Sequence, residues 1–214
     1  MPMVTSETRT VLVVAAERFE LKHIRPPKDE YWILKANGPG GALAGEAADA
    51  VGPHVDAVLS VGLCGALAEE LEVGQIVIGS SINGVAIDQP QCSGRFISGP
   101  IVSIDHVAQT VAEKRRLRKT GAIAVEMESA AVLERAQTWN VPFYCVRAVS
   151  DRASEGFALD LNAARDEVGR FRVSSVLAQA IRRPGAGLPE LFRLYRNSEA
   201  ASKALGEFIG NCSF

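Results

Sequence analysis

Residues Thr10–Ala16 read TVLVVAA, a run of small and β-branched apolar residues after a single threonine. A continuous apolar run of this length is typical of a strand that is buried on both faces. Outward from it, further strand-like runs lie at residues 31–36, 56–61, 75–79, 101–104, 123–125 and 143–149. Helix-like stretches lie at residues 42–51, 107–119, 129–139, 160–182 and 188–209.

This alternation predicts an α/β fold with a mixed, mostly parallel central sheet flanked by helices. The chain has 214 residues, which is long enough to bury a large core. We expect one domain over residues 1–183 and a C-terminal helical extension over 184–214 that packs on it. The expected helix at 107–119 carries many charged residues, including Lys114, and its charged face is expected to be solvated.

Composition excludes several classes of protein. Apolar residues make up 47%, charged residues 22%, and the net charge is −2, so the basic surface of a nucleic-acid-binding protein is absent. The four cysteines are Cys64, Cys92, Cys145 and Cys212, and their spacing fits no zinc site. We interpret them as buried free thiols, which predicts a cytoplasmic protein without a metal.

Ligands in sheets of this kind bind at the carboxyl ends of the strands. Glu17 and Glu20 follow the first strand, and a glycine cluster at 38–41 follows the second. Gly62-Leu63-Cys64-Gly65 follows the third strand and is expected to form a tight turn. No G-x-G-x-x-G follows the first strand, which excludes a dinucleotide-binding site of the usual type.

Acidic residues also follow two later strands. Glu126-Met127-Glu128 places two carboxylates between an apolar strand and a helix, which suits either a vicinal diol such as that of ribose or the helix dipole. Asp151 follows the strand 143–149 and is either a helix cap or a catalytic acid. Several carboxylates at one edge of a sheet favour a functional site there.

Three motifs carry a resemblance to a known superfamily. They are VLSVGLCGAL at 58–67, AVEMESAA at 124–131, and the segment 141–151 that ends in VRAVSD. The chain resembles the nucleoside phosphorylases and 5′-methylthioadenosine/S-adenosylhomocysteine nucleosidases. Residues 114–129 and 176–205 further resemble the hopanoid-associated branch, whose members are thought to remove adenine from the lipid nucleoside adenosylhopane.

The resemblance implies cleavage of a purine N-ribosidic bond in the cytoplasm by a homo-oligomer, without a cofactor. By similarity, Glu128 holds the ribose hydroxyls, Met127 packs under the sugar and Glu126 helps to seat it. Asp151 is the general acid at N7 of the base, where burial would favour its protonated form. Ser150 and Arg147 orient Asp151, and Val102 lies near the base.

The nucleophile stays open at this point. Glu17 or Glu20 is expected to activate water, and Glu17 lies nearer to the strand end. Ser60 and Leu63 stand where a phosphorylase would bind phosphate, so the water reaction is preferred. If the enzyme did use phosphate, the groups left to bind it would be Arg18, Arg25 and the backbone amides at Gly38, Gly62 and Leu63.

Two further expectations concern the surroundings of the site. The segment before Glu126 is shorter than in enzymes for small nucleosides, and no aromatic residue that would stack on the purine is recognisable. An open 5′ side would admit a bulky, lipid-linked substituent. Apolar residues of the stretch 188–214 form an amphipathic helix, which packs on the body or on a sister subunit, or contacts a membrane through Arg193, Arg196 and Lys203.

A non-catalytic nucleoside-binding protein remains the alternative to an enzyme.

Overall fold

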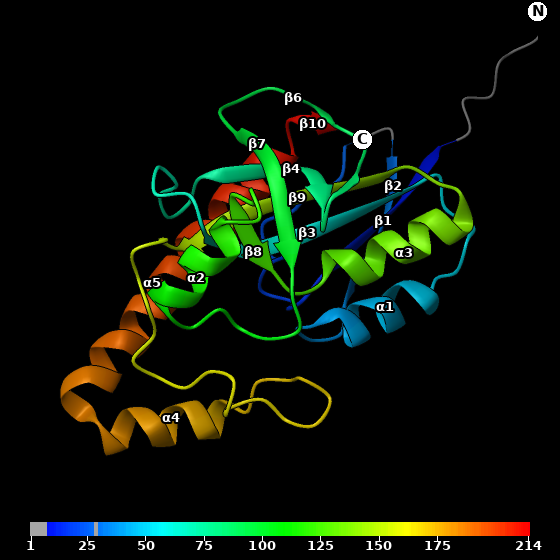
Figure 1. Ribbon diagram of the computed structural model, residues 1–214. Helices are drawn as coiled ribbons and strands as arrows, with labels where there is room; N and C mark the ends of the chain where they lie inside the picture. Colours follow the sequence, from blue (N-terminus) through cyan, green and yellow to red (C-terminus); the bar gives the residue numbers. More distant parts are fainter. Residues whose placement is uncertain (1–7, 28–29) are drawn as a thin grey trace, which may run out of the picture.

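The computed structural model describes residues 8–27 and 30–214, and it confirms the α/β fold (Figure 1). The strands are β1 (Arg9–Ala15), β2 (Glu30–Ala36), β3 (Ala57–Ala66), β4 (Ile76–Ile82), β5 (Val85–Ala86), β6 (Gln91–Cys92), β7 (Ile97–Ser103), β8 (Ala124–Glu126), β9 (Phe143–Asp151) and β10 (Cys212–Ser213). The helices are α1 (Gly41–Asp49), α2 (Val111–Arg118), α3 (Ser129–Trp139), α4 (Val173–Arg182) and α5 (Pro184–Ile209).

The main sheet has eight strands and is mixed, with mostly parallel pairs. Strands β2, β1, β3 and β9 run parallel to one another, as do β4, β7 and β8. Antiparallel pairs join β3 to β8 and β4 to β9. Strands β3, β8, β7, β4 and β9 therefore close into a ring, from which β1 and β2 extend as an open sheet.

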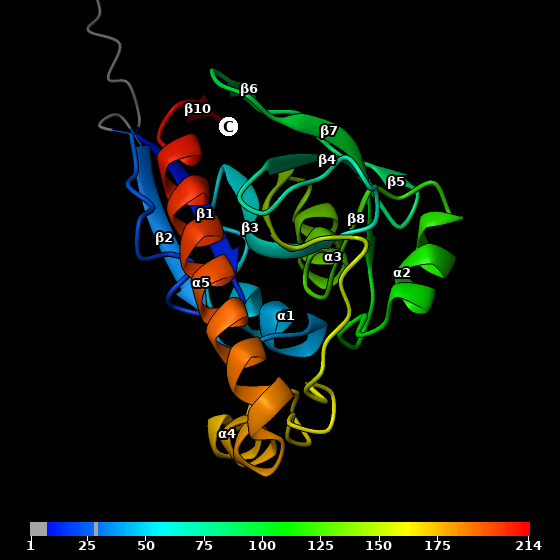
Figure 2. The same ribbon diagram turned by 90° about the vertical axis from the view of Figure 1, so that its left-hand side faces the viewer.

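Helices cover both faces of this sheet (Figures 1 and 2). Alanines of α1 and apolar residues of α3 pack on one face, and their core includes Leu12, Val58 and Val149. The second half of α5 packs on the other face, where Leu205 and Ile209 are buried with Val13. Because α5 supplies core residues, the sheet depends on it for burial on that side.

Two expectations about local structure are wrong. The expected helix at 160–182 begins only at Val173, and the segment before it is irregular. Asp160 and Asp166 accept backbone N–H groups from residues that follow them, and such bonds compete with a helix. The expected turn at 62–65 is instead the continuation of β3, because residues 62–65 still pair with β9, with a shift of register between Cys64 and Gly65.

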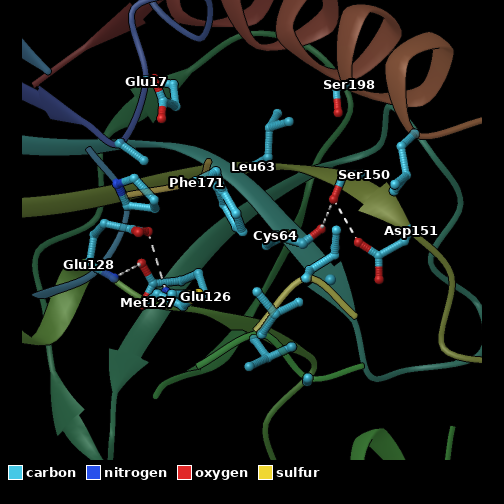
Figure 3. Close-up of a pocket in the computed structure, with 18 of the residues that line it drawn as sticks. Glu17, Leu63, Cys64, Glu126, Met127, Glu128, Ser150, Asp151, Phe171 and Ser198 are labelled. Atoms are coloured by element: carbon cyan, nitrogen blue, oxygen red, sulfur yellow. Dashed lines mark hydrogen bonds between the residues drawn. The ribbon is translucent and has the colours of Figure 1, made fainter. Parts of the chain in front are cut away.

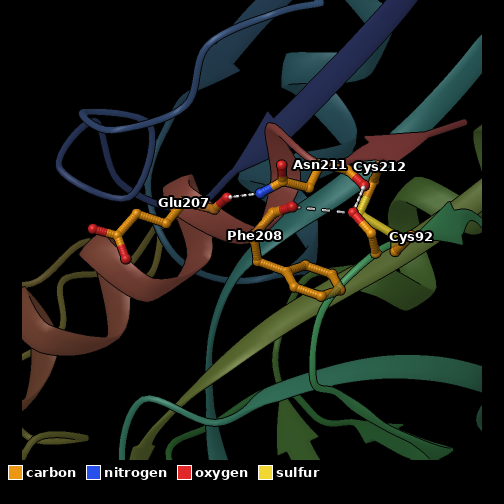
Figure 4. Close-up of a disulfide and its surroundings, with 6 residues drawn as sticks. Cys92, Glu207, Phe208, Asn211 and Cys212 are labelled. Atoms are coloured by element: carbon orange, nitrogen blue, oxygen red, sulfur yellow. Dashed lines mark hydrogen bonds between the residues drawn. A yellow bond between two sulfur atoms is a disulfide. The ribbon is translucent and has the colours of Figure 1, made fainter.

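A disulfide joins Cys92 to Cys212, so the expectation that these two cysteines are free is wrong (Figure 4). The antiparallel pairing of β6 with β10 places the two residues directly opposite each other. Cys64 and Cys145 are free and buried, as expected. Since two of the four cysteines are paired, the argument from free thiols to a reducing compartment loses its basis, and the cytoplasmic localisation stays a prediction.

Reduction of this disulfide is expected to lower the free energy of unfolding. The cross-link spans 120 residues, and closing a loop of that size in the unfolded chain is worth about 4–5 kcal/mol in the chain-entropy model. The measurement is urea unfolding with and without dithiothreitol. The double variant Cys92→Ser/Cys212→Ser is the control, and its unfolding should not respond to dithiothreitol. Equal stability of the wild type in both conditions would contradict the expectation.

Candidate functional site

A cavity of about 330 Å³ lies at the carboxyl ends of β1, β3, β8 and β9 (Figure 3). The predicted site residues that line it are Glu17, Glu20, Leu63, Glu126, Met127, Glu128, Ser150 and Asp151. Figure 3 shows Glu128 and Asp151 on opposite sides of this space. Residues from four separate strand ends therefore share one enclosure, as the sequence predicts.

Glu128 lies at the start of α3 with its carboxylate held by backbone groups. Its Oε1 accepts a hydrogen bond from Gly40 N at 2.7 Å, and its Oε2 accepts one from Met127 N at 3.3 Å. Burial raises its pKa to about 8, and the neighbouring Glu126 carboxylate adds to the shift. Each oxygen keeps a lone pair that can accept a hydrogen bond from a ligand hydroxyl.

This raised pKa makes the stability of the protein depend on pH. Between pH 4.5 and about 8, the folded chain keeps a proton on Glu128 that the unfolded chain loses. The folded state then binds more protons, so this group lowers the free energy of unfolding as the pH rises. Glu128→Gln removes this titration, and its free energy of unfolding relative to wild type should rise over that window. The measurement is urea unfolding at several pH values, with the exposed Glu70→Gln as control. If the difference in free energy of unfolding between Glu128→Gln and wild type stayed constant with pH, the prediction would be contradicted.

Glu126 and Arg147 form a buried ion pair beneath Glu128. Arg147 Nη2 donates to Glu126 Oε2 at 2.6 Å and to the hydroxyls of Ser60 and Ser129. Burial alone would raise the pKa of Glu126, but the charge of Arg147 holds it below its ordinary value. Glu126 Oε2 also accepts the backbone N–H groups of Glu128 and Ser129, so the pair fixes the start of α3.

The prediction that Arg147 orients Asp151 is wrong. All hydrogen bonds of the Arg147 guanidinium go to Ser60, Glu126, Ser129 and the carbonyl of Val146. Four residues along an extended strand span about 13 Å, which separates the two side chains. The role of Arg147 is to hold the Glu126 carboxylate.

Glu20 points into the cavity from the segment after β1. Its Oε2 accepts from Glu17 N at 2.8 Å, and its Oε1 accepts from Leu63 N at 2.9 Å. Gly62 makes room for this carboxylate, because a Cβ there would lie 3.0 Å from Glu20 Oε1. Burial raises the pKa of Glu20, which suits a proton acceptor that works near neutral pH.

Glu17 also lines the cavity but is only half-buried. Its carboxylate makes no hydrogen bond to the described residues, whereas its backbone N–H is used to hold Glu20. Burial raises its pKa, and the charge of Arg170 opposes the shift. Of the two candidates, Glu20 is the one whose carboxylate the fold fixes in place.

Asp151 is held from both sides at the end of β9. Ser150 Oγ donates to its Oδ1 at 2.7 Å, as predicted, and the buried Lys114 ammonium donates to its Oδ2. Lys114 also donates to the carbonyl of Arg152 at 2.7 Å. Gly65 leaves space for the Asp151 carboxylate, since a Cβ there would lie 3.0 Å from Oδ2.

Three of the remaining predicted residues do not line the cavity. Val102 pairs with Val125 in the β7–β8 ladder and packs in a satellite apolar cluster, so its predicted place near the base is wrong. Gly38 donates to the carbonyl of Ala16 and serves the turn after β2. Gly62 lies next to the Glu20 carboxylate and does not itself line the cavity.

Sequence reasoning missed several residues of the site. Phe157, Phe171 and His106 line the cavity. Phe157 lies on the Asp151 side, because the Lys114 ammonium that contacts Asp151 is 5.6 Å from its ring centroid. Lys114 was expected on a solvated helix face, yet it lies on the buried stripe of α2. A spacing of three residues along Ala108, Val111, Lys114 and Leu117 is the signal that could have revealed it.

Much of the remaining cavity wall is apolar. It comes from the segment after β1, the irregular segment after β9, and the helices α4 and α5. The apolar side chains are Phe19, Leu161, Phe171, Val176 and Leu194. No arginine or lysine among the described residues lines the cavity, whereas five carboxylates do.

Comparisons with known proteins agree with this geometry. Residues 86–182 match the family described as the phosphorylase superfamily. The chain is 31% identical over 132 residues to the 5′-methylthioadenosine/S-adenosylhomocysteine nucleosidase of Staphylococcus aureus (strain JH9), a match that covers 46% of this chain and 58% of that protein. Both matches cover less than half of this chain. The match to the curated relative spans little more than half of its length.

Solved structures match over nearly the whole chain. The 5′-methylthioadenosine/S-adenosylhomocysteine nucleosidase of Helicobacter pylori has a TM-score of 0.65 at 17% identity, covering 94% of this chain and 96% of that one. The futalosine hydrolase of the same organism has a TM-score of 0.66 at 16% identity, with the same coverage. At this identity the likeness establishes the fold, and it confirms the predicted nucleoside phosphorylase-like architecture.

Proposed function

We propose that this chain cleaves the N-ribosidic bond of a purine nucleoside with water and releases the base. The observation that carries the proposal is the placement of Glu128, Glu20 and Asp151 around one cavity, which no lysine or arginine of residues 8–27 and 30–214 lines. A carboxylate-lined space suits an oxocarbenium-like sugar and disfavours a phosphate dianion. Its similarity to nucleosidases over part of the chain supports the same reaction.

Each carboxylate has a separate role in the proposed reaction. Glu128 accepts hydrogen bonds from the ribose hydroxyls and positions C1′ of the sugar. Glu20 takes a proton from water as the water oxygen forms a bond to C1′. Asp151 gives a proton to N7 of the base as the C1′–N9 bond breaks, so the base leaves as a neutral molecule.

The supporting residues fix these three groups. Arg147 and Glu126 hold the start of α3 and with it Glu128. Ser150 and Lys114 hold the two oxygens of Asp151. Phe157 takes the place near the base that was predicted for Val102, because it lies on the Asp151 side of the cavity.

We further propose a nucleoside with a bulky apolar 5′ substituent. Apolar side chains such as Phe171, Val176 and Leu194 make up much of the cavity wall and could contact such a substituent. The resemblance of residues 176–205 to the hopanoid-associated branch makes adenosylhopane the candidate substrate. Turnover of 5′-methylthioadenosine faster than that of adenosines with long 5′-alkyl groups would contradict this choice.

One experiment separates hydrolysis from phosphorolysis. The protein is incubated with 5′-substituted adenosines with and without inorganic phosphate, and both products are identified by mass. We expect free adenine and the free sugar at the same rate in both conditions. Adenine release that needs phosphate, together with a sugar 1-phosphate product, would identify a phosphorylase instead. Binding without release of adenine would identify a nucleoside-binding protein.

A further inference from the structure

Helices α4 and α5 expose a row of large apolar side chains on their outer surface. In Figures 1 and 2, α4 lies at one end of the molecule, apart from the sheet and beside the first turns of α5. Six apolar side chains there are between 43% and 70% exposed, namely Val173, Leu177, Ile181, Leu188, Phe192 and Tyr195. We call this set the hairpin face. Exposed apolar residues grouped in this way mark an interaction surface.

The packing of the two helices brings the two halves of the hairpin face together. A Cβ on Gly187 would lie 2.6 Å from Ala180 Cα, so the helix backbones touch at this point. Ile181 and Leu188 follow directly on the touching residues. Leu177 and Ile181 are four residues apart, as are Leu188 and Phe192, so each pair shares one side of its helix.

Arginines predominate along the hairpin face, and the acidic residue Asp160 contacts Gln179 of α4. Residues 168–189 contain four arginines and no aspartate or glutamate. Arg172, Arg182, Arg183 and Arg196 are exposed. Within the described residues they form no ion pair, because the glutamates of α5 pair with Arg193, Lys22 and Lys203 instead. An apolar row bordered by arginines is the pattern of a helix that lies on an anionic bilayer.

We propose that the hairpin face docks on an anionic lipid surface. A second copy of the chain fits less well, since a two-fold interface would bring the arginines of one copy against those of the other without an acidic partner. No helix of the described residues has both the length and the apolar character to cross a bilayer, so the contact is peripheral. The predicted contact through Arg193 and Lys203 is not retained, because both pair with glutamates.

The proposal does not depend on the proposed function, although it complements it. Val176 of α4 and Leu194 of α5 line the cavity. Docking by the outer sides of the same helices would place this part of the cavity wall next to the lipid.

The test is flotation of the protein with vesicles. We expect the wild type to bind vesicles of equimolar phosphatidylcholine and phosphatidylglycerol and not vesicles of phosphatidylcholine alone. Ile181→Ser/Phe192→Ser should weaken partitioning about 100-fold or more through lost apolar burial. Arg182→Gln/Arg183→Gln should weaken it about 30-fold through lost attraction to the lipid headgroups. High salt should weaken wild-type binding.

Matched variants control for general changes of surface. Tyr31→Ser removes an exposed ring far from the hairpin face, and Arg115→Gln/Arg116→Gln removes two adjacent exposed arginines from α2. Both should bind anionic vesicles as the wild type does. The proposal is overturned if binding is equal on neutral vesicles, if the wild type does not bind, or if sedimentation shows a dimer that Ile181→Ser/Phe192→Ser separates. Cleavage of a small soluble nucleoside by all four variants should stay at the wild-type rate, which separates this outcome from the proposed function.

Discussion

Asp151→Asn is expected to lower adenine release by about 10²–10⁴-fold, the usual contribution of a general acid. Asparagine keeps the size of the side chain and its hydrogen bond with Ser150 but cannot protonate N7. The affinity for a 5′-substituted adenosine should change only a few-fold, because Glu128 and the apolar walls are untouched. The measurements are initial rates of adenine release and the Kd from calorimetry, with unfolding followed in parallel because Lys114 loses its charged partner.

Ser150→Ala is the matched control for this variant. It removes one of the two hydrogen bonds that hold the Asp151 carboxylate, and Lys114 still contacts the other oxygen. We therefore expect a smaller loss than for Asp151→Asn, about tenfold, since a hydrogen bond to a charged group is worth about 1.5–3 kcal/mol. If Asp151→Asn releases adenine as fast as the wild type, Asp151 is not the general acid.

Glu20→Gln is expected to abolish most of the hydrolysis, again by about 10²–10⁴-fold, because glutamine cannot accept a proton from water. Glutamine fills the same space beside Gly62, so the surroundings of the side chain are retained. Glu17→Gln is the matched control and should keep the rate within a few-fold. The measurement is adenine release at saturating substrate across a range of pH.

The pH profile adds a second readout for Glu20. The wild-type rate should fall as the pH drops through the raised pKa of the base, and this limb should be missing in Glu20→Gln. A large loss in Glu17→Gln with normal activity in Glu20→Gln would reverse the assignment and restore the preference drawn from the sequence.

Local patterns were sufficient to predict most of the fold. A run such as Thr10–Ala16 is apolar throughout because both faces of β1 are covered, and this can be seen without knowledge of its neighbours. The helix-like stretch at 129–139 was equally visible, and α3 spans the same residues. Glu126, Glu128 and Asp151 stood out because a carboxylate directly after an apolar strand needs an explanation.

Features that depend on distant partners could not be predicted in this way. Lys114 lies among charged residues; its spacing from Val111 and Leu117 hints that it is buried, but its partner Asp151 is 37 residues away and is seen only in the fold. The Cys92–Cys212 pair depends on the pairing of β6 with β10, two strands too short to give a pattern. The sequence favoured Glu17 over Glu20 only because Glu17 lies nearer to the end of the strand. In the structure, the turn at 17–24 brings the Glu20 carboxylate to Leu63.

Two groups of residues in the cavity wall differ in how they are anchored, and this bears on how the protein can diversify. Glu128 and Asp151 stand on a sheet whose ring of strands leaves little room for change. Val176 and Leu194 stand on a helix pair in which α4 packs mainly against α5. Mutations after Asp151 can therefore remodel the tail that is accepted while the bond-breaking residues keep their positions, so new substrates can evolve without loss of the original chemistry.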